Sequence, residues 1–171
     1  MRTAQQAKEQ DHSLYELLYV AQEDLGQASF YAKHLLKKGW HFVLWESRRR
    51  WTTYMQQSAY TTALVAAYSR PFVQSRGRPS LPKKLIQYSL SQKKLHESVL
   101  NLRHEVYAHS DVGSRRIRPL KINGHPSAIE FLPAMRLTKE EIEELLVMIS
   151  ITSSTIHARL EQLIDTVASE T

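Results

Sequence analysis

The chain has 171 residues, of which 42% are apolar, and this is enough to bury the core of one globular domain. It contains no cysteine, which excludes disulfides, thiol nucleophiles and thiolate metal ligands. No apolar run approaches the roughly 20 residues of a membrane span, and the first residues lack the apolar region of a signal peptide. We therefore expect a soluble, cytoplasmic protein that forms a single domain over residues 1–171.

The net charge of +6 is distributed unevenly along the chain. Between Arg48 and Lys121 there are fifteen Lys or Arg and three Asp or Glu, a local net charge of +12. The segments before and after this region carry −1 and −5. A basic middle segment suggests a polyanionic partner such as RNA, although it is also compatible with an ordinary solvated surface.

The first predicted helix covers about Ser13–Lys38. Ser13 and Glu16 have the spacing of a capping box, and Gly39 is a suitable stop. Its apolar and small residues alternate spacings of four and three, which places them on one stripe. These residues are Leu14, Leu18, Ala21, Leu25, Ala28, Ala32 and Leu35.

A second helix is predicted over about Trp40–Ser69, with Pro71 ending it. Tryptophans and tyrosines are frequent in this segment and could stack on RNA bases. Their helical spacing favours a place in the core or at a dimer interface instead. The residues that we expect on its apolar face are Leu44, Trp51, Met55, Ala59 and Ala66.

The chain is then interrupted by glycine and prolines, with a basic loop over Arg76–Ser80 and a short predicted helix over Lys83–Ser89. The third long helix should cover about Gln92–His109. Its stripe consists of Leu95, Val99, Leu102 and Val106.

A non-helical insert of about residues 112–136 follows, in which Asn123-Gly124 predicts the tight turn of a β-hairpin. The last helix has a clear start, because Thr138 and Glu141 form a capping-box pair and Leu137 and Ile142 have hydrophobic-staple spacing. The whole pattern predicts an all-α fold, an antiparallel four- to five-helix bundle with this insert before the last helix. The stripe of the last helix is Ile142, Leu145, Ile149, Ile156, Leu160, Leu163 and Val167.

Arg103 and His109 lie near the end of the third predicted helix. An imidazole can move the proton of an RNA 2′-hydroxyl, and a guanidinium can hold the charge that builds on phosphorus. On an ideal helix the two side chains point about 120° apart, on either side of the buried stripe. They can converge if the helix loosens at His109 or if two copies face each other across a two-fold axis. The residues alone are equally compatible with a helix-capping histidine and an unrelated arginine.

The segment Leu102–Asp111 resembles the signature of the HEPN family, an Arg, four to six residues and a His at a helix end. His104 fills the polar position that follows the Arg in that family. Ala108-His109-Ser110-Asp111 is similar to the abortive-infection and phage-defence branch, and Tyr68–Phe72 resembles it more weakly. The resemblance implies a homodimeric, metal-independent endoribonuclease in a prokaryotic defence or toxin–antitoxin system, with RNA as substrate and, in the latter case, a cognate antitoxin protein.

The resemblance also implies residue roles. His109 would be the general acid or base, Arg103 would stabilise the transition-state charge, and His104 would orient the phosphate. No cofactor is expected, and a metal site at His104, His109 and Asp111 is disfavoured because their helical directions diverge. The alternative is a non-catalytic HEPN module that binds RNA, a nucleotide or a protein partner. The residues that we expect to contact substrate are Arg70, Arg76, Arg78, Tyr107, Asp111, Arg115 and Arg116.

Overall fold

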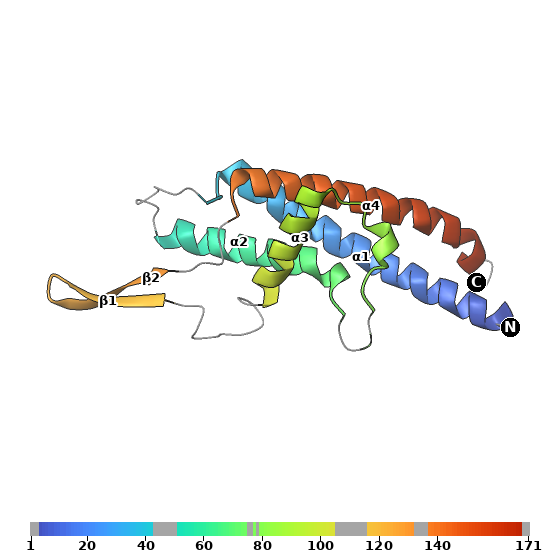
Figure 1. Ribbon diagram of the computed structural model, residues 1–171, viewed down its shortest axis with the longest axis horizontal. Coiled ribbons are helices and arrows are strands. Elements are labelled where there is room, and N and C mark those ends of the chain that lie inside the picture. Colours follow the sequence, from blue (N-terminus) through green and yellow to red (C-terminus); the bar gives the residue numbers. More distant parts are fainter. Residues whose placement is uncertain are drawn as a thin grey trace.

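Four helices form the body of the molecule, and a two-stranded hairpin precedes the last of them (Figure 1). This confirms the all-α bundle with a small insert. The computed structural model describes residues 4–42, 51–74, 77, 79–104, 116–131 and 137–168. Within these ranges no helix has both the length and the apolar character that crossing a membrane requires. The elements are α1 (Ala4–Lys38), α2 (Trp51–Ser69), α3 (Leu90–Leu102), β1 (Arg116–Ile122), β2 (His125–Phe131) and α4 (Lys139–Ala168).

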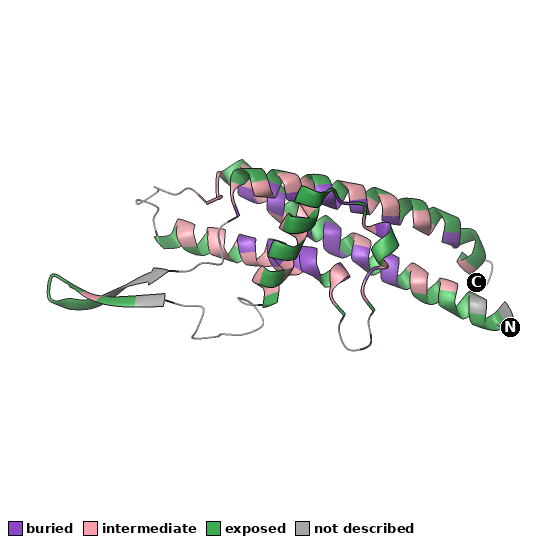
Figure 2. Ribbon diagram, viewed as in Figure 1, coloured by how far each residue is buried: buried purple, intermediate pink, exposed green. Residues whose placement is uncertain are grey.

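The core lies along the seam between α1 and α4, which pack against each other as a long antiparallel pair (Figures 1 and 2). The predicted stripe of α1 is buried there, except that Leu14 is only partly buried against the core. The predicted stripe of α4 is likewise buried or half-buried over its whole length. α2 runs beside this pair, and α3 crosses it obliquely (Figure 1).

The N-terminal end of α1 differs from the prediction, whereas its C-terminal end agrees with it. The helix begins at Ala4, so Ser13 lies inside it and the predicted capping box at Ser13 is wrong. The preceding residues are mostly Ala, Gln, Lys and Glu, which are good helix formers and extend the helix. Gly39 ends it with φ 64°, donating its N–H to the Leu36 carbonyl at 3.0 Å, while Trp40 donates to Leu35 at 2.8 Å. This Schellman motif places Trp40 outside the helix, so the predicted start of the second helix at Trp40 is also wrong.

The apolar face predicted for the second helix does not face the core. Trp51 is 72% exposed, Met55 is 40% exposed and Ala59 is exposed as well, whereas the predicted Ala66 is half-buried. The buried face of α2 contains Leu64, Val65 and Tyr68 instead, while the predicted Leu44 lies outside the described residues. Because α2 carries no charged residue and its Thr, Gln and Ser are spread around the helix, its sequence does not mark which face points outwards.

The connection into α3 also differs from the prediction. Only Lys83–Leu85 form a short 3₁₀ turn (η2), and Ser89 is the N-cap of α3. The Ser89 hydroxyl accepts the Gln92 N–H at 3.2 Å, and the Gln92 side chain accepts the Ser89 N–H at 2.9 Å. This capping box starts α3 at Leu90 and was not anticipated from the sequence. The part of this predicted helix from residue 105 to His109 lies outside the described residues.

The hairpin predicted around Asn123-Gly124 is confirmed. β1 and β2 pair antiparallel, with Ile122 opposite His125. Asn123 and Gly124 have φ values of 49° and 85°, the left-handed conformation that a type I′ turn requires at both positions. Pro119 fits in β1 because a two-stranded ribbon leaves each strand with one unpaired edge.

The capping box at the start of α4 is confirmed. The Thr138 hydroxyl accepts the Glu141 N–H at 3.2 Å, and the Glu141 carboxylate accepts the Thr138 N–H at 2.8 Å. Leu137 and Ile142, on either side of this box, are both buried. Hydrogen bonding from the backbone at the helix start lowers the pKa of the exposed Glu140 carboxyl, with a further contribution from Thr138.

We expect Thr138→Ala to lower the free energy of unfolding by about 1 kcal/mol, because it leaves an N-terminal N–H of α4 without its acceptor. Urea denaturation followed by circular dichroism measures this change. Ser154→Ala, at an exposed position within the same helix, is the control and should change stability by less than about 0.5 kcal/mol. Equal effects of the two substitutions would contradict a stabilising cap.

Candidate functional site

Arg103 of the predicted site directly follows helix α3, so the packing of α3 determines where Arg103 lies. Val99 is fully buried, and Leu95 and Leu102 pack against the same core. At the start of the helix, the Gln92 side-chain amide donates to the Glu144 carboxylate of α4 at 2.7 Å. The first turn of α3 is therefore fixed to α4, and Arg103 lies at the opposite end of the helix.

His96 anchors the middle of α3 against α2 and the segments that flank it. Its ring lies among Tyr68, Phe72 and Tyr88, with ring centroids 5.8, 4.6 and 5.4 Å away in edge-on arrangements. The His96 Nδ1 atom is 2.9 Å from the Tyr68 hydroxyl. Burial lowers the pKa of His96, and the negative charge of Glu97 partly opposes this. The neutral imidazole is therefore the form that the fold favours.

A chain of buried hydroxyls continues from His96 to α4. Thr152 donates its proton to the Met148 carbonyl at 2.9 Å, so Tyr88, 2.7 Å away, donates to Thr152. The hydroxyl oxygens of Tyr68 and Tyr88 are 3.5 Å apart, which is long for a hydrogen bond. The hydrogen bond between the Tyr68 hydroxyl and His96 Nδ1, at 2.9 Å, is therefore the stronger of the two that Tyr68 makes. Burial raises the pKa of both tyrosines, which stay neutral. This network ties α2, α3 and α4 together through polar groups.

Arg103 follows directly after the last residue of α3. Its backbone is still helical, with φ −60° and ψ −44°, and its N–H donates to the carbonyls of Leu100 and Val99. The Arg103 side chain is half-buried and the neighbouring His104 is exposed. Arg103 lies on the same side of α3 as His96, about two turns further along.

Most of the other predicted site residues cannot be placed beside Arg103. Arg116 belongs to β1, but its side chain is not among those described. The following residues lie outside the described part of the chain: Arg76, Arg78, Tyr107, His109, Asp111 and Arg115.

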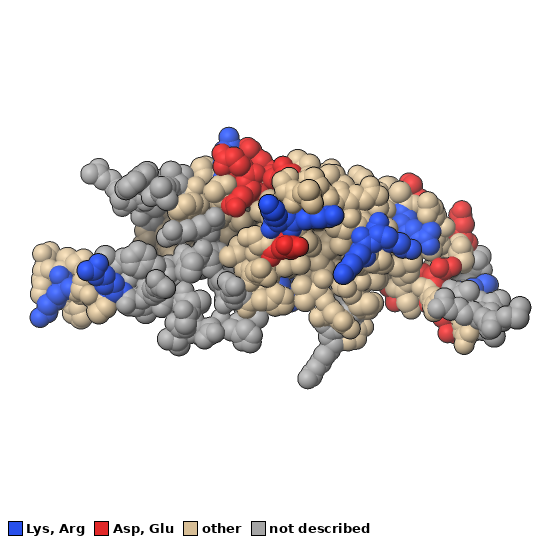
Figure 3. All heavy atoms as spheres, in the orientation of Figure 1, with Lys and Arg blue, Asp and Glu red and all other residues tan. Residues whose placement is uncertain are grey.

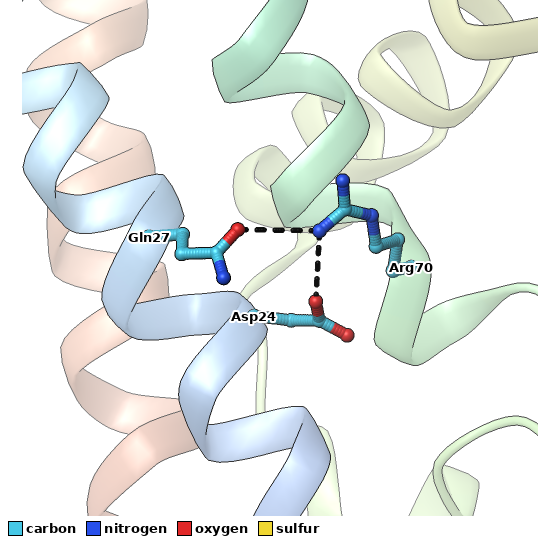
Figure 4. Close-up of polar contacts among 3 residues, drawn as sticks. All are labelled: Asp24, Gln27 and Arg70. Atoms are coloured by element: carbon cyan, nitrogen blue, oxygen red, sulfur yellow. Dashed lines mark hydrogen bonds and ion pairs between the residues drawn. The ribbon is translucent and has the colours of Figure 1, made fainter.

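Arg70, predicted to contact substrate, forms an ion pair inside the fold (Figure 4). It lies in the 3₁₀ turn Arg70–Phe72 (η1) after α2, and its Nη1 donates to the carboxylate of Asp24 at 3.1 Å and to the Gln27 side chain at 3.2 Å, both on α1. The Asp24 side chain is only 7% exposed, whereas that of Arg70 is 49% exposed. Arg70 therefore neutralises a buried carboxylate with one nitrogen, while the rest of its guanidinium reaches the surface.

A shallow groove runs along another side of α3. It is lined by polar side chains and one apolar residue, and helical positions place it away from the side that carries Arg103. The groove residues are Lys94, Glu97, Ser98, Asn101 and Leu102.

Charged side chains are distributed unevenly over the surface. In Figure 3, basic side chains lie over α3 and η2 and on the hairpin, and acidic ones gather near the start of α4. Within the described ranges, no three His, Asp or Glu side chains are close enough to hold a metal ion.

Comparisons of the chain with protein-family models, with curated proteins and with solved structures give no match. The functional assignment therefore depends on the residues of this chain and on their geometry.

Two features of the site were not anticipated from the sequence. The first is the His96 network, which joins residues far apart in the chain and has no local signature. The second is the pairing of Arg70 with Asp24. Asp24 lies next to Leu25 in the apolar stripe of α1, and a carboxylate at such a position indicates a buried partner.

We expect Arg70→Ala to lower the free energy of unfolding by about 2 kcal/mol, because it removes the cation beside a buried carboxylate. A double-mutant cycle with Asp24→Asn, measured by urea denaturation, should give a coupling energy of at least about 1 kcal/mol. The exposed Arg118→Ala is the control and should change stability by less than about 0.5 kcal/mol. Additive effects of the Arg70 and Asp24 substitutions would show that the pair does not stabilise the fold.

The lowered pKa of His96 predicts a pH dependence of stability. As pH falls below the ordinary histidine value of 6.5, the unfolded chain takes up a proton that the folded chain resists. The contribution of His96 to stability is therefore fully present above about pH 6.5 and is lost as pH falls towards its lower folded pKa. Urea denaturation between about pH 7.5 and pH 5 should show a shallower loss in His96→Gln than in the wild type.

The control for this experiment is His125→Gln, at an exposed position in the hairpin, which should keep the pH dependence of the wild type. Identical pH profiles for His96→Gln and the wild type would contradict the role given to burial.

Proposed function

We propose that this chain is a HEPN-type, metal-independent endoribonuclease of a prokaryotic defence or toxin–antitoxin system, acting as a homodimer. The single observation that carries this proposal is the motif in which Arg103 and His109 are separated by five residues after a bundle helix. The helical bundle agrees with the architecture that the HEPN resemblance implies.

The proposed reaction uses the 2′-hydroxyl of the RNA as nucleophile. His109 accepts its proton, the 2′-oxygen attacks the adjacent phosphorus, and the bond from phosphorus to the 5′-oxygen breaks. The products are a 2′,3′-cyclic phosphate and a 5′-hydroxyl, whose proton comes from water, and the hydroxide formed takes the proton held by His109. Arg103 stabilises the extra negative charge of the pentacovalent transition state. His104, exposed beside Arg103, holds the phosphate in place.

The charge distribution supports RNA as the substrate. Exposed lysines lie on η2 and on the first half of α3, and the hairpin adds exposed Arg118 and Lys121. Such groups contact phosphates independently of sequence, and the affinity that they provide falls steeply with salt. Among the described residues most acidic side chains lie on α1 and α4, so the exposed cations of η2, α3 and the hairpin are the groups available to a polyanion. The exposed lysines are Lys83, Lys84, Lys93 and Lys94.

A site shared between two subunits follows from the direction of the motif residues. On an ideal helix Arg103 and His109 point about 120° apart, so a single regular helix does not direct both side chains at one phosphate. Two copies of α3 near a two-fold axis bring Arg103 of one protomer towards His109 of its partner. The proposed active site is therefore composite.

We expect Arg103→Ala and His109→Ala to fold normally and to lose RNA cleavage by at least about 10²-fold, because each removes one part of the transition-state stabilisation. The assay incubates pure protein with RNA in the presence of EDTA and detects fragments ending in a cyclic phosphate. His157→Ala, at an exposed position on α4, is the matched control and should cleave as the wild type does.

Two results would contradict the proposal. Cleavage at the wild-type rate by both variants would remove the motif from the chemistry. Salt-dependent RNA binding without cleavage by the wild type would favour the non-catalytic module.

A further inference from the structure

The hairpin of β1 and β2 projects from the helical body (Figure 1). Among the described residues, its two strands pack on each other, and neither packs comparably on a helix. Each strand has seven residues, so the hairpin extends over roughly 23 Å. The described hairpin therefore buries little surface against the bundle, and a projection that contributes so little to the fold is suited to contact with a partner.

The free edges of the hairpin do not favour the addition of a further strand. Ile122 and His125 flank the two-residue turn as a hydrogen-bonded pair, and pairs of this kind alternate with pairs whose N–H groups point outwards. Pro119 and Pro126 both occupy outward-pointing positions, where each removes one donor from a free edge. The hairpin is thus protected against strand addition by another protein, and its binding surfaces are its two faces and its tip.

The outer part of the hairpin is basic. Arg118 and Lys121 are both exposed, and residues 118–126 contain no Asp or Glu. The one acidic residue of the two strands, Glu130, is paired with Ile117 near the base. Side chains alternate between the faces of a strand, so Arg118 and Lys121 lie on opposite faces. The ribbon therefore presents a cation on each side, which is complementary to a partner that is anionic on two sides.

We propose that the hairpin is an arm that binds the double-stranded part of an RNA substrate, with its tip in the minor groove. The minor groove of A-form RNA is wide and shallow, and a phosphate strand borders it on each side. An arm that enters this groove tip first directs Arg118 towards one strand and Lys121 towards the other. Exposed Asn123 and His125 at the turn can form hydrogen bonds with ribose 2′-hydroxyls. That the duplex is RNA rests on the proposed function.

A single strand is a poorer occupant of this surface. Proteins that bind unpaired RNA stack its bases on aromatic rings. Residues 118–126 contain no Phe, Tyr or Trp, so only the His125 imidazole is available for this role. The apolar group at the tip is Ile122, which is 55% exposed and lies on the same face as Arg118. Its aliphatic side chain suits contact with riboses in a groove, and a folded ribbon matches phosphates that a duplex holds at fixed positions.

Fluorescence anisotropy with a labelled RNA duplex of about 20 base pairs, and with an oligoadenylate of the same length, tests the proposal. The protein is the full chain with His109→Ala, so that cleavage does not consume the RNA. We expect the duplex to bind at least about 10-fold more tightly than the single strand. Arg118→Ala combined with Lys121→Ala should weaken duplex binding at least about 10-fold and lower the salt slope by about 2, because each phosphate contact contributes about 1.

The matched control removes the same charge from another element. Lys33→Ala combined with Lys37→Ala, at two exposed positions on α1, should weaken duplex binding by less than about 3-fold, because salt screens charges that make no contact. Circular dichroism should give equal helicity for both double variants. Equal affinities for duplex and single strand, tighter binding of a DNA duplex of the same sequence, or equal effects of the two double variants would overturn the proposal.

A further variant separates groove contact from charge. Ile122→Ser leaves the net charge unchanged, so it should weaken duplex binding by at least about 3-fold at an unchanged salt slope. An unchanged affinity in this variant would overturn the placement of the tip in the groove.

These results separate the arm from the proposed activity. Duplex binding through the hairpin by a protein whose wild type leaves RNA intact supports the arm and removes the ribonuclease function. A wild type that cleaves RNA, together with a hairpin double variant that binds the duplex normally, overturns the arm and leaves the ribonuclease function in place.

Discussion

The seam between α1 and α4 is the contact on which the rest of the molecule depends. Alanines in the α1 stripe bring the two helix axes close together, and the leucines between them fill the space on either side. Both helices are far longer than α2 or α3, so the seam forms a platform to which the shorter helices attach. α2 adds Leu64, Val65 and Tyr68 to this platform, and α3 adds only one fully buried residue, Val99.

Because α3 buries so little apolar surface, polar contacts fix its position. Gln92 bonds to Glu144 at one end, and the His96 ring reaches Tyr68 and, through the tyrosine hydroxyls, Thr152. Directional bonds of this kind specify orientation more sharply than apolar contact does. They hold the first half of the helix, so the end that carries Arg103 projects from a rigid base. A short helix held in this way suits the presentation of a functional side chain.

Local sequence patterns predicted the features that are encoded locally. The stripe of α1, the Asn123-Gly124 turn and the Thr138 capping box each depend on a few neighbouring residues, and the structure has all three. The start of α1 was mispredicted because Ser13 has the spacing of a cap while good helix formers precede it. At the candidate site, Arg103 could be located at the end of its helix. The position of Asp24 in the apolar stripe indicates a buried partner, but no local pattern reveals that this partner is Arg70, 46 positions away.

The apolar face predicted for α2 is exposed in the structure, and this error has a different origin. Helical periodicity reports which positions are apolar, and it was right that Trp51, Met55 and Ala59 form an apolar face. It cannot report whether that face is buried by the same chain or by another copy. An uncharged helix with one face in the core and another in water loses the free energy that burying Trp51 and Met55 would give. Trp51 and Met55 are therefore exposed at positions that periodicity alone would assign to a core.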